Sequence, residues 1–159
     1  MARKHTAAPS GQIVVMDHES RVLADNPLGD PYRRKLPVFL PPQYDEGATR
    51  GRVRRFPVLY DLVGFTGSGL SHVNWKPFGD NVPERAARLI HARRMGPVII
   101  VFPDCFTALG GNQYVNSLAI GNYADYLTRE IIPFVDREFR TLAGRAHRGC
   151  FGKSSGGYG

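Results

Sequence analysis

Residues 152–156 place a serine between two glycines, in the order Gly152-Lys153-Ser154-Ser155-Gly156. Two kinds of chemistry use such a segment: a glycine-rich loop can hold phosphate, and the pattern G-x-S-x-G can hold a nucleophilic serine on a sharp strand-to-helix turn. A phosphate loop requires G-x-x-x-x-G-K-[ST], but His147 stands where its first glycine belongs. The spacing therefore argues against a phosphate loop and favours Ser154 as a nucleophile.

A nucleophilic serine also needs N–H donors for the negative charge that develops on the attacked carbonyl oxygen. The N–H of the next residue, Ser155, is one expected donor, and the N–H of Phe65 in the segment Gly64-Phe65-Thr66-Gly67-Ser68-Gly69 is the other. Ser155 itself does not fit as the nucleophile, because Lys153 would occupy a glycine position. A glycine turn without chemistry remains the alternative for each segment.

Apolar runs predict the strands that must position these loops. Three runs are typical of strands buried in a parallel sheet, at 56–65, 98–102 and 147–152, and Asp61 interrupts the first without an evident reason. Near the N-terminus, 11–25 is typical of two short strands or a hairpin, and 34–40 of a strand ended by proline.

Helical patterns separate the apolar runs. In 81–96, Pro83 suits the first turn and Gly96 the end. In 121–140, Asn122 is the expected N-cap and Pro133 should kink the helix. Strands alternating with helices predict an α/β fold with a mostly parallel sheet and antiparallel strands at the N-terminus, in which ligands meet the loops at the carboxyl ends of the strands.

Composition excludes several other classes of protein. The chain has 159 residues, 42% of them hydrophobic and 22% charged, and no apolar run approaches the roughly 20 residues of a membrane helix. Its net charge of +7 includes the cluster "RGRVRR" at 50–55, which lacks the motifs of a nucleic-acid module and is interpreted as a solvated loop. We expect a cytoplasmic protein without nucleic-acid or membrane partners, a loose tail over residues 1–10, and Cys150 in the core.

Five segments occur in an order that resembles the putative-esterase branch of the α/β-hydrolases: "NPLGDPYRRKLPVFLPPQYD", "FPVLYDLVGFTGSG", "VFPD", "NYADYLTREIIPFVDREFR" and "GCFGKSSGGYG". That branch includes esterase D, enterochelin esterases, feruloyl esterases and mycolyltransferases. The resemblance implies a Ser-acid-His hydrolase of small carboxylic esters or thioesters, with Ser154 as nucleophile and the amides of Phe65 and Ser155 as oxyanion donors. The chain departs from many members by having Val63-Gly64 in place of His-Gly.

In this fold the acid and the histidine of the triad follow the serine, but only residues 155–159 follow Ser154. His147 begins the same strand, about 20 Å away at roughly 3.3 Å per residue, whereas His72 could approach the site. The sequence therefore predicts that residues 11–159 are the N-terminal part of a single α/β-hydrolase domain. We expect this chain alone to be inactive and poorly stable, with the acid and histidine beyond residue 159.

No metal or organic cofactor is implied by the cysteine and histidine spacing. A second hypothesis remains open, in which the chain is a non-catalytic α/β module whose glycine loops bind a small anion or a partner.

Overall fold

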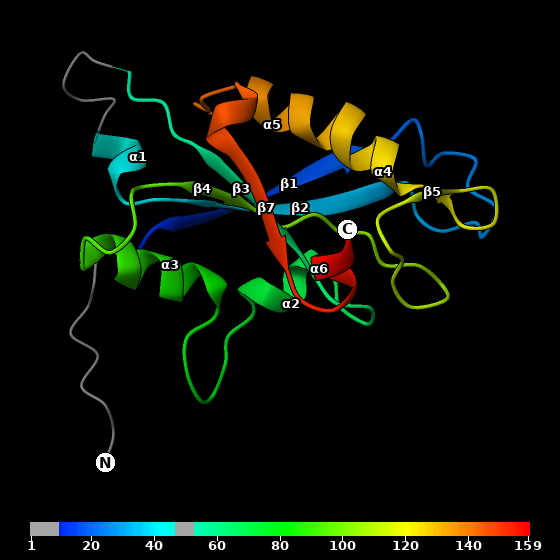
Figure 1. Cartoon of the computed structure of the whole chain (residues 1–159), viewed down its shortest axis with the longest axis horizontal. Helices are drawn as coiled ribbons and strands as arrows, with labels where there is room; N and C mark the ends of the chain where they lie inside the picture. Colours follow the sequence, from blue (N-terminus) through cyan, green and yellow to red (C-terminus); the bar gives the residue numbers. More distant parts are fainter. Residues whose placement is uncertain (1–9, 47–52) are drawn as a thin grey trace.

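The computed structural model describes residues 10–46 and 53–159 (Figure 1). Residues 1–9 of the expected tail, and Arg50 and Arg52 of the basic cluster, lie outside the described residues.

A five-stranded mixed sheet runs through the centre of the molecule in the order β1-β2-β4-β3-β7. Its parallel part pairs β3 with both β4 and β7, while β1 pairs antiparallel with β2 and β2 antiparallel with β4. The predicted α/β fold with N-terminal antiparallel strands is confirmed. The strands are β1 (Gln12–Glu19), β2 (Arg33–Leu40), β3 (Val58–Leu62), β4 (Ile99–Val101) and β7 (Arg148–Gly152).

The N-terminal segment differs from the expected pair of strands or hairpin. Residues 12–19 form the single strand β1, which pairs over its whole length with β2. The chain then turns at 21–28 instead of forming a second strand, and Glu130 accepts hydrogen bonds from the amides of Arg21 and Val22 in that turn. A contact more than 100 residues away in the sequence therefore replaces the local hairpin.

Helices cover both faces of the sheet (Figure 1). On one face, α4 (Tyr123–Asp125), the π-helix η1 (Tyr126–Ile131) and α5 (Ile132–Glu138) pack on alternate side chains of β2, β3 and β4. On the other face, α3 (Val82–His91) packs on Phe39, Ile100 and Phe102. The shorter elements are α1 (Gln43–Glu46), α2 (Gly69–Val73), β5 (Asn116–Ser117), β6 (Gly121–Asn122), η2 (Arg145–His147) and α6 (Ser155–Tyr158).

The start of α3 was predicted correctly, but its end was not. Asn81 accepts a hydrogen bond from the N–H of Glu84, the Glu84 carboxylate accepts one from the N–H of Asn81, and Pro83 lies in the first turn. The helix ends at His91 and not at Gly96, because Arg93 adopts a positive φ of 56° that no helical residue can have.

Pro133 lies where the helix changes from π-helical to α-helical. The π-helix η1 immediately precedes α5, whose second residue is Pro133. Proline lacks an N–H and its ring crowds the carbonyl of the preceding turn, so the wider turn accommodates it. The prediction that Asn122 caps this helix is wrong, because the Asn122 side chain makes no capping hydrogen bond. The side chain of Asn116 instead accepts a hydrogen bond from the N–H of Asp125 at 3.0 Å.

Candidate functional site

Ser154 lies on the bend between β7 and α6. The strand ends at Gly152 and the helix begins at Ser155, so only two residues turn the chain. Ser154 has φ 57° and ψ −124°, backbone angles that residues with a Cβ rarely adopt, and its side chain is exposed. Hydrogen bonds from Gly156 N to Lys153 O (3.1 Å) and from Gly157 N to Ser154 O (2.9 Å) close the bend.

The two flanking glycines are required by close packing on β3. A Cβ on Gly156 would collide with the carbonyl oxygen of Leu62, and a Cβ on Gly152 would collide with the carbonyl oxygens of Leu62 and Gly156. The bend therefore rests directly on the end of the neighbouring strand. The spacing G-x-S-x-G follows from this contact, because any larger residue at either glycine position would push the serine away from β3.

The loop that follows β3 reaches the same place. A Cβ on Gly64 would lie 3.8 Å from the Cβ of Ser154, and the N–H of Gly67 donates to the carbonyl of Gly64 at 3.0 Å. Among the described residues, neither the N–H of Phe65 nor that of Ser155 donates to an acceptor. The structure thus brings the serine next to the loop of Phe65 and leaves both amides free.

Asp61 and His72 form a pair that the sequence did not reveal. The Asp61 carboxylate is buried, with 1% of its side chain exposed, and its Oδ2 lies 2.6 Å from Nδ1 of His72 in α2. An ionised carboxylate can only accept, so Nδ1 carries the proton. The signal in the sequence was the unexplained charge inside an apolar strand. The pair joins the two ends of the loop that contains Phe65.

The remaining described histidines lie elsewhere. His18 packs against Phe134 with its Nε2 3.6 Å from Glu130, His91 is the last residue of α3, and His147 ends η2 at the start of β7. In the ranges 10–46 and 53–159, no hydrogen bond joins a histidine to the hydroxyl of Ser154.

Tyr114 is a second residue near the site to which sequence reasoning gave no role. Its hydroxyl donates to the carbonyl of Val63 at 2.6 Å, and its own backbone has a positive φ of 58°. It belongs to the segment 110–117, "GGNQYVNS", which contains no motif that assigns a role to any of its residues. The hydrogen bond to Val63 links positions 51 residues apart, so no local pattern could predict it.

The two cysteines have opposite environments. Cys105 is buried, and burial raises the pKa of its thiol well above the ordinary value, so the thiol stays protonated. Cys150 is exposed, which contradicts the predicted place in the core. The reason is the position of β7 at the edge of the described sheet, where the side chain of Cys150 faces an open groove.

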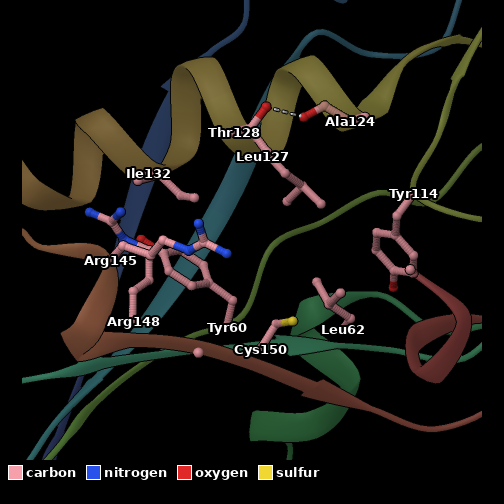
Figure 2. Close-up of a pocket in the computed structure, with 12 residues that line it drawn as sticks. Tyr60, Leu62, Tyr114, Ala124, Leu127, Thr128, Ile132, Arg145, Arg148 and Cys150 are labelled. Atoms are coloured by element: carbon pink, nitrogen blue, oxygen red, sulfur yellow. Dashed lines mark hydrogen bonds between the residues drawn. The ribbon is translucent and has the colours of Figure 1, made fainter.

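That groove is a cavity of about 420 Å³ between the α4–η1–α5 helix and the strands β3 and β7 (Figure 2). Leu127 and Ile132 line it from the helix, Leu62 and Cys150 from the strands, and Tyr114 closes one end. None of the three predicted site residues lines it. Its lining includes Tyr114 and Gly159, the residue that ends the helix after Ser154.

Among the residues that the structure describes, every helix is too short or too polar to span a membrane. No group of three or more His, Cys, Asp or Glu side chains there could hold a metal ion.

Comparison with known proteins adds a family and a fold. The family model described as "Putative esterase" matches residues 31–159. Among solved structures, the chain is similar to a ferulic acid esterase from Anaeromyces mucronatus in complex with ferulic acid, with a TM-score of 0.66 and 21% identity over 98% of this chain and 53% of that one.

Two further structures are similar to the same extent. An S-formylglutathione hydrolase from Agrobacterium tumefaciens has a TM-score of 0.64 and 18% identity, covering 95% of this chain and 52% of that one. A fluorophosphonate-binding serine hydrolase from Staphylococcus aureus has a TM-score of 0.66 and 18% identity, covering 93% of this chain and 49% of that one. The chain has the α/β-hydrolase fold and spans about half the length of the structures that it matches.

Proposed function

Because the chain belongs to the esterase family matched over residues 31–159, we propose that the protein containing it is a serine hydrolase of small carboxylic esters or thioesters. One observation carries the assignment of roles: an exposed serine sits on a strained bend beside two free backbone amides. Ser154 is the nucleophile in this proposal, and the N–H groups of Phe65 and Ser155 bind the oxyanion. Relatives named as a ferulic acid esterase and an S-formylglutathione hydrolase support the substrate class.

The proposed reaction has two steps. Ser154 Oγ attacks the carbonyl carbon while a general base takes its proton, and the two amides bind the negative oxygen of the tetrahedral intermediate. The bond to the leaving alkoxide or thiolate then breaks, and the leaving group receives that proton. Water attacks the acyl group on Ser154 in the second step, which releases a carboxylic acid and restores the hydroxyl.

The general base in this proposal is supplied from outside the described residues. None of the described histidines, which are His18, His72, His91 and His147, makes a hydrogen bond to Ser154. A serine without a base is a weak nucleophile. We therefore expect the 159-residue chain by itself to show no ester turnover.

Labelling with a fluorophosphonate probe tests the nucleophile. We expect the full-length protein to react with the probe, Ser154→Ala to lose the label, and Ser155→Ala to keep it. Ser155→Ala is a matched control because it removes the neighbouring hydroxyl but keeps the main-chain N–H. Labelling that survives Ser154→Ala, or a full-length protein that does not label at all, would contradict the proposal.

A further inference from the structure

Tyr114 touches both segments to which the proposed oxyanion donors belong. Its hydroxyl donates a hydrogen bond to the carbonyl of Val63, two residues before Phe65. Its side chain packs against Gly159, which follows α6, the helix that begins with Ser155. Figure 2 shows the ring beside α6. We propose that Tyr114 is a positioning residue for the oxyanion site, which it holds in shape through the carbonyl of Val63. This inference rests on the proposed esterase function and deepens it.

The hydroxyl of Tyr114 is suited to act as a permanent donor. The residue is 8% exposed, and burial, together with the nearby acidic groups, raises the pKa of its phenol well above the ordinary value. The phenol is therefore protonated at neutral pH. The 2.6 Å bond to Val63 is buried, so losing it would leave a backbone carbonyl without a partner.

The bond matters for Phe65 because of the peptide geometry around Gly64. The Gly64 carbonyl accepts the N–H of Gly67, which fixes the plane of the peptide that carries the Phe65 N–H. Tyr114 fixes the plane of the preceding peptide through Val63. Gly64 joins the two planes and, having no Cβ, could rotate more freely than any other residue. With both carbonyls held, the Phe65 N–H keeps one direction.

Tyr114 is itself held by a rigid loop. Asn112 accepts the N–H of Tyr114 at 2.7 Å and donates to the carbonyl of Cys105 at 2.7 Å. The buried Arg34 anchors the start of this loop, donating to the carbonyl of Phe106 at 2.8 Å. A Cβ on Gly111 would collide with the backbone of Phe65, so the loop is also in direct contact with that residue. Tyr114 has an unfavourable positive φ in the conformation that directs its ring toward Val63.

The test compares Tyr114→Phe with Tyr126→Phe in the full-length protein. Tyr126 is a matched control because its hydroxyl is also buried but has no hydrogen-bond partner among the described residues. With a p-nitrophenyl ester, we expect Tyr114→Phe to lower kcat about 10-fold to 100-fold with KM changed less than about 3-fold, since a displaced oxyanion donor is felt mainly in the transition state. Tyr126→Phe should leave both constants within about 2-fold of wild type.

A second measurement does not depend on catalysis. Hydrogen–deuterium exchange of the peptides covering 62–68 should become at least about 10-fold faster in Tyr114→Phe and in Asn112→Ala, but not in Tyr126→Phe. Tyr114→Phe removes the hydrogen bond to the Val63 carbonyl, and Asn112→Ala removes the side chain that holds Tyr114 in place. Asn112→Ala provides a second route to the same loss if Tyr114→Phe does not fold.

The outcomes separate the two proposals. If Ser154-dependent labelling is present but Tyr114→Phe leaves kcat and exchange at 62–68 unchanged, the positioning role is wrong and the esterase function stands. A loss of kcat that Tyr126→Phe reproduces also contradicts it. If the full-length protein shows no Ser154-dependent labelling, the proposed function fails, and the exchange measurement still decides whether Tyr114 holds the loop.

Discussion

The backbone angles of Ser154 are strained and destabilise the folded state. A non-glycine residue at φ 57° and ψ −124° is strained by about 1–3 kcal/mol. The strain is offset by the hydrogen bonds of α6 and by the tight contact of Gly152 and Gly156 with Leu62. Strain at a single exposed polar residue is typical of a functional position, because a relaxed bend would serve equally well for folding.

We expect Ser154→Gly to be more stable than Ser154→Ala by about 1 kcal/mol, while both lose the fluorophosphonate label. Glycine adopts a positive φ without steric cost, whereas alanine retains the strain. Urea unfolding of the two variants of the full-length protein measures the difference. Equal free energies of unfolding would show that position 154 is not strained.

The glycines beside Ser154 provide a second prediction. Gly156→Ala should lower the free energy of unfolding by more than about 3 kcal/mol, because its Cβ would collide with a backbone carbonyl that cannot move without separating β3 from β7. Gly157→Ala is the matched control in the same helix, since its Cβ would lie 3.4 Å from the nearest atom, Gly152 O. If thermal unfolding shows the same decrease in Tm for both variants, the tight contact between Gly156 and Leu62 is contradicted.

At the scale of elements, β3 and α2 are joined by Asp61 and His72 around the Phe65 loop. A buried carboxylate is tolerated only with a partner, and removing one partner of such a pair costs about 3–5 kcal/mol when both are buried. His72 is 32% exposed, so we expect a smaller effect. The pair contributes mainly by fixing the two ends of the loop relative to each other.

A double-mutant cycle tests this pair. We expect His72→Ala to lower the free energy of unfolding by about 2 kcal/mol, because the buried carboxylate loses its donor. In the double variant Asp61→Leu/His72→Ala, an apolar side chain replaces the unpaired charge in strand β3, and stability should recover by at least about 1 kcal/mol relative to His72→Ala. Chemical unfolding of full-length wild type, the single variants Asp61→Leu and His72→Ala, and the double variant measures the four free energies. Additive effects would show that the two side chains do not interact.

Glu130 connects η1 to the turn after β1, and this connection should depend on pH. Burial opposes its ionisation, but hydrogen bonds from Ser20, Arg21 and Val22 outweigh burial and hold the pKa of Glu130 below its ordinary value of 4.5. A lowered pKa in the folded state means that the ionised form stabilises the fold. That stability is present above pH 4.5 and is lost as the pH falls through the folded pKa.

We therefore expect Glu130→Gln to be less stable than wild type by about 1–2 kcal/mol at pH 7, with the difference narrowing below pH 4.5. Glu19→Gln is the control, because Glu19 pairs with Arg33 on the exposed surface of β1 and β2 and should change stability little. Urea unfolding of the full-length proteins at several pH values measures both. A difference for Glu130→Gln that is constant with pH would contradict the role of its charge.

For the whole molecule, the important feature is the edge of the described sheet at β7. Phe151 is 40% exposed on this strand, and the groove beside it leaves Leu127 and Ile132 open. An exposed strand edge with apolar side chains favours association between copies of a chain. The chain spans about half the length of the structures to which it is similar.

We expect the 159-residue chain expressed alone to melt without a cooperative transition, to aggregate and to hydrolyse no p-nitrophenyl ester. Differential scanning calorimetry with light scattering measures the first two properties, and release of p-nitrophenol measures the third. The full-length protein under the same conditions is the control. A sharp, reversible melt with Ser154-dependent turnover in the short chain would contradict this expectation.

Local patterns made much of the fold predictable. The strands around 58–62 and 99–101 and the capped start of α3 depend on residues a few positions apart, and each was correctly located. The same holds for the bend at Ser154, because its two glycines touch one neighbouring strand. Errors arose where a distant contact decided the result, as in the turn after β1 that Glu130 holds.

The sequence by itself determined the order of strands and helices and the position of a serine between glycines, because both follow from short-range sterics and periodicity. Only the tertiary structure decided that Asp61 meets His72, that Tyr114 bonds to Val63, and that Cys150 is exposed. Each of these facts depends on which segments become neighbours when the sheet assembles. A side chain's own residue type does not specify its partner across the fold.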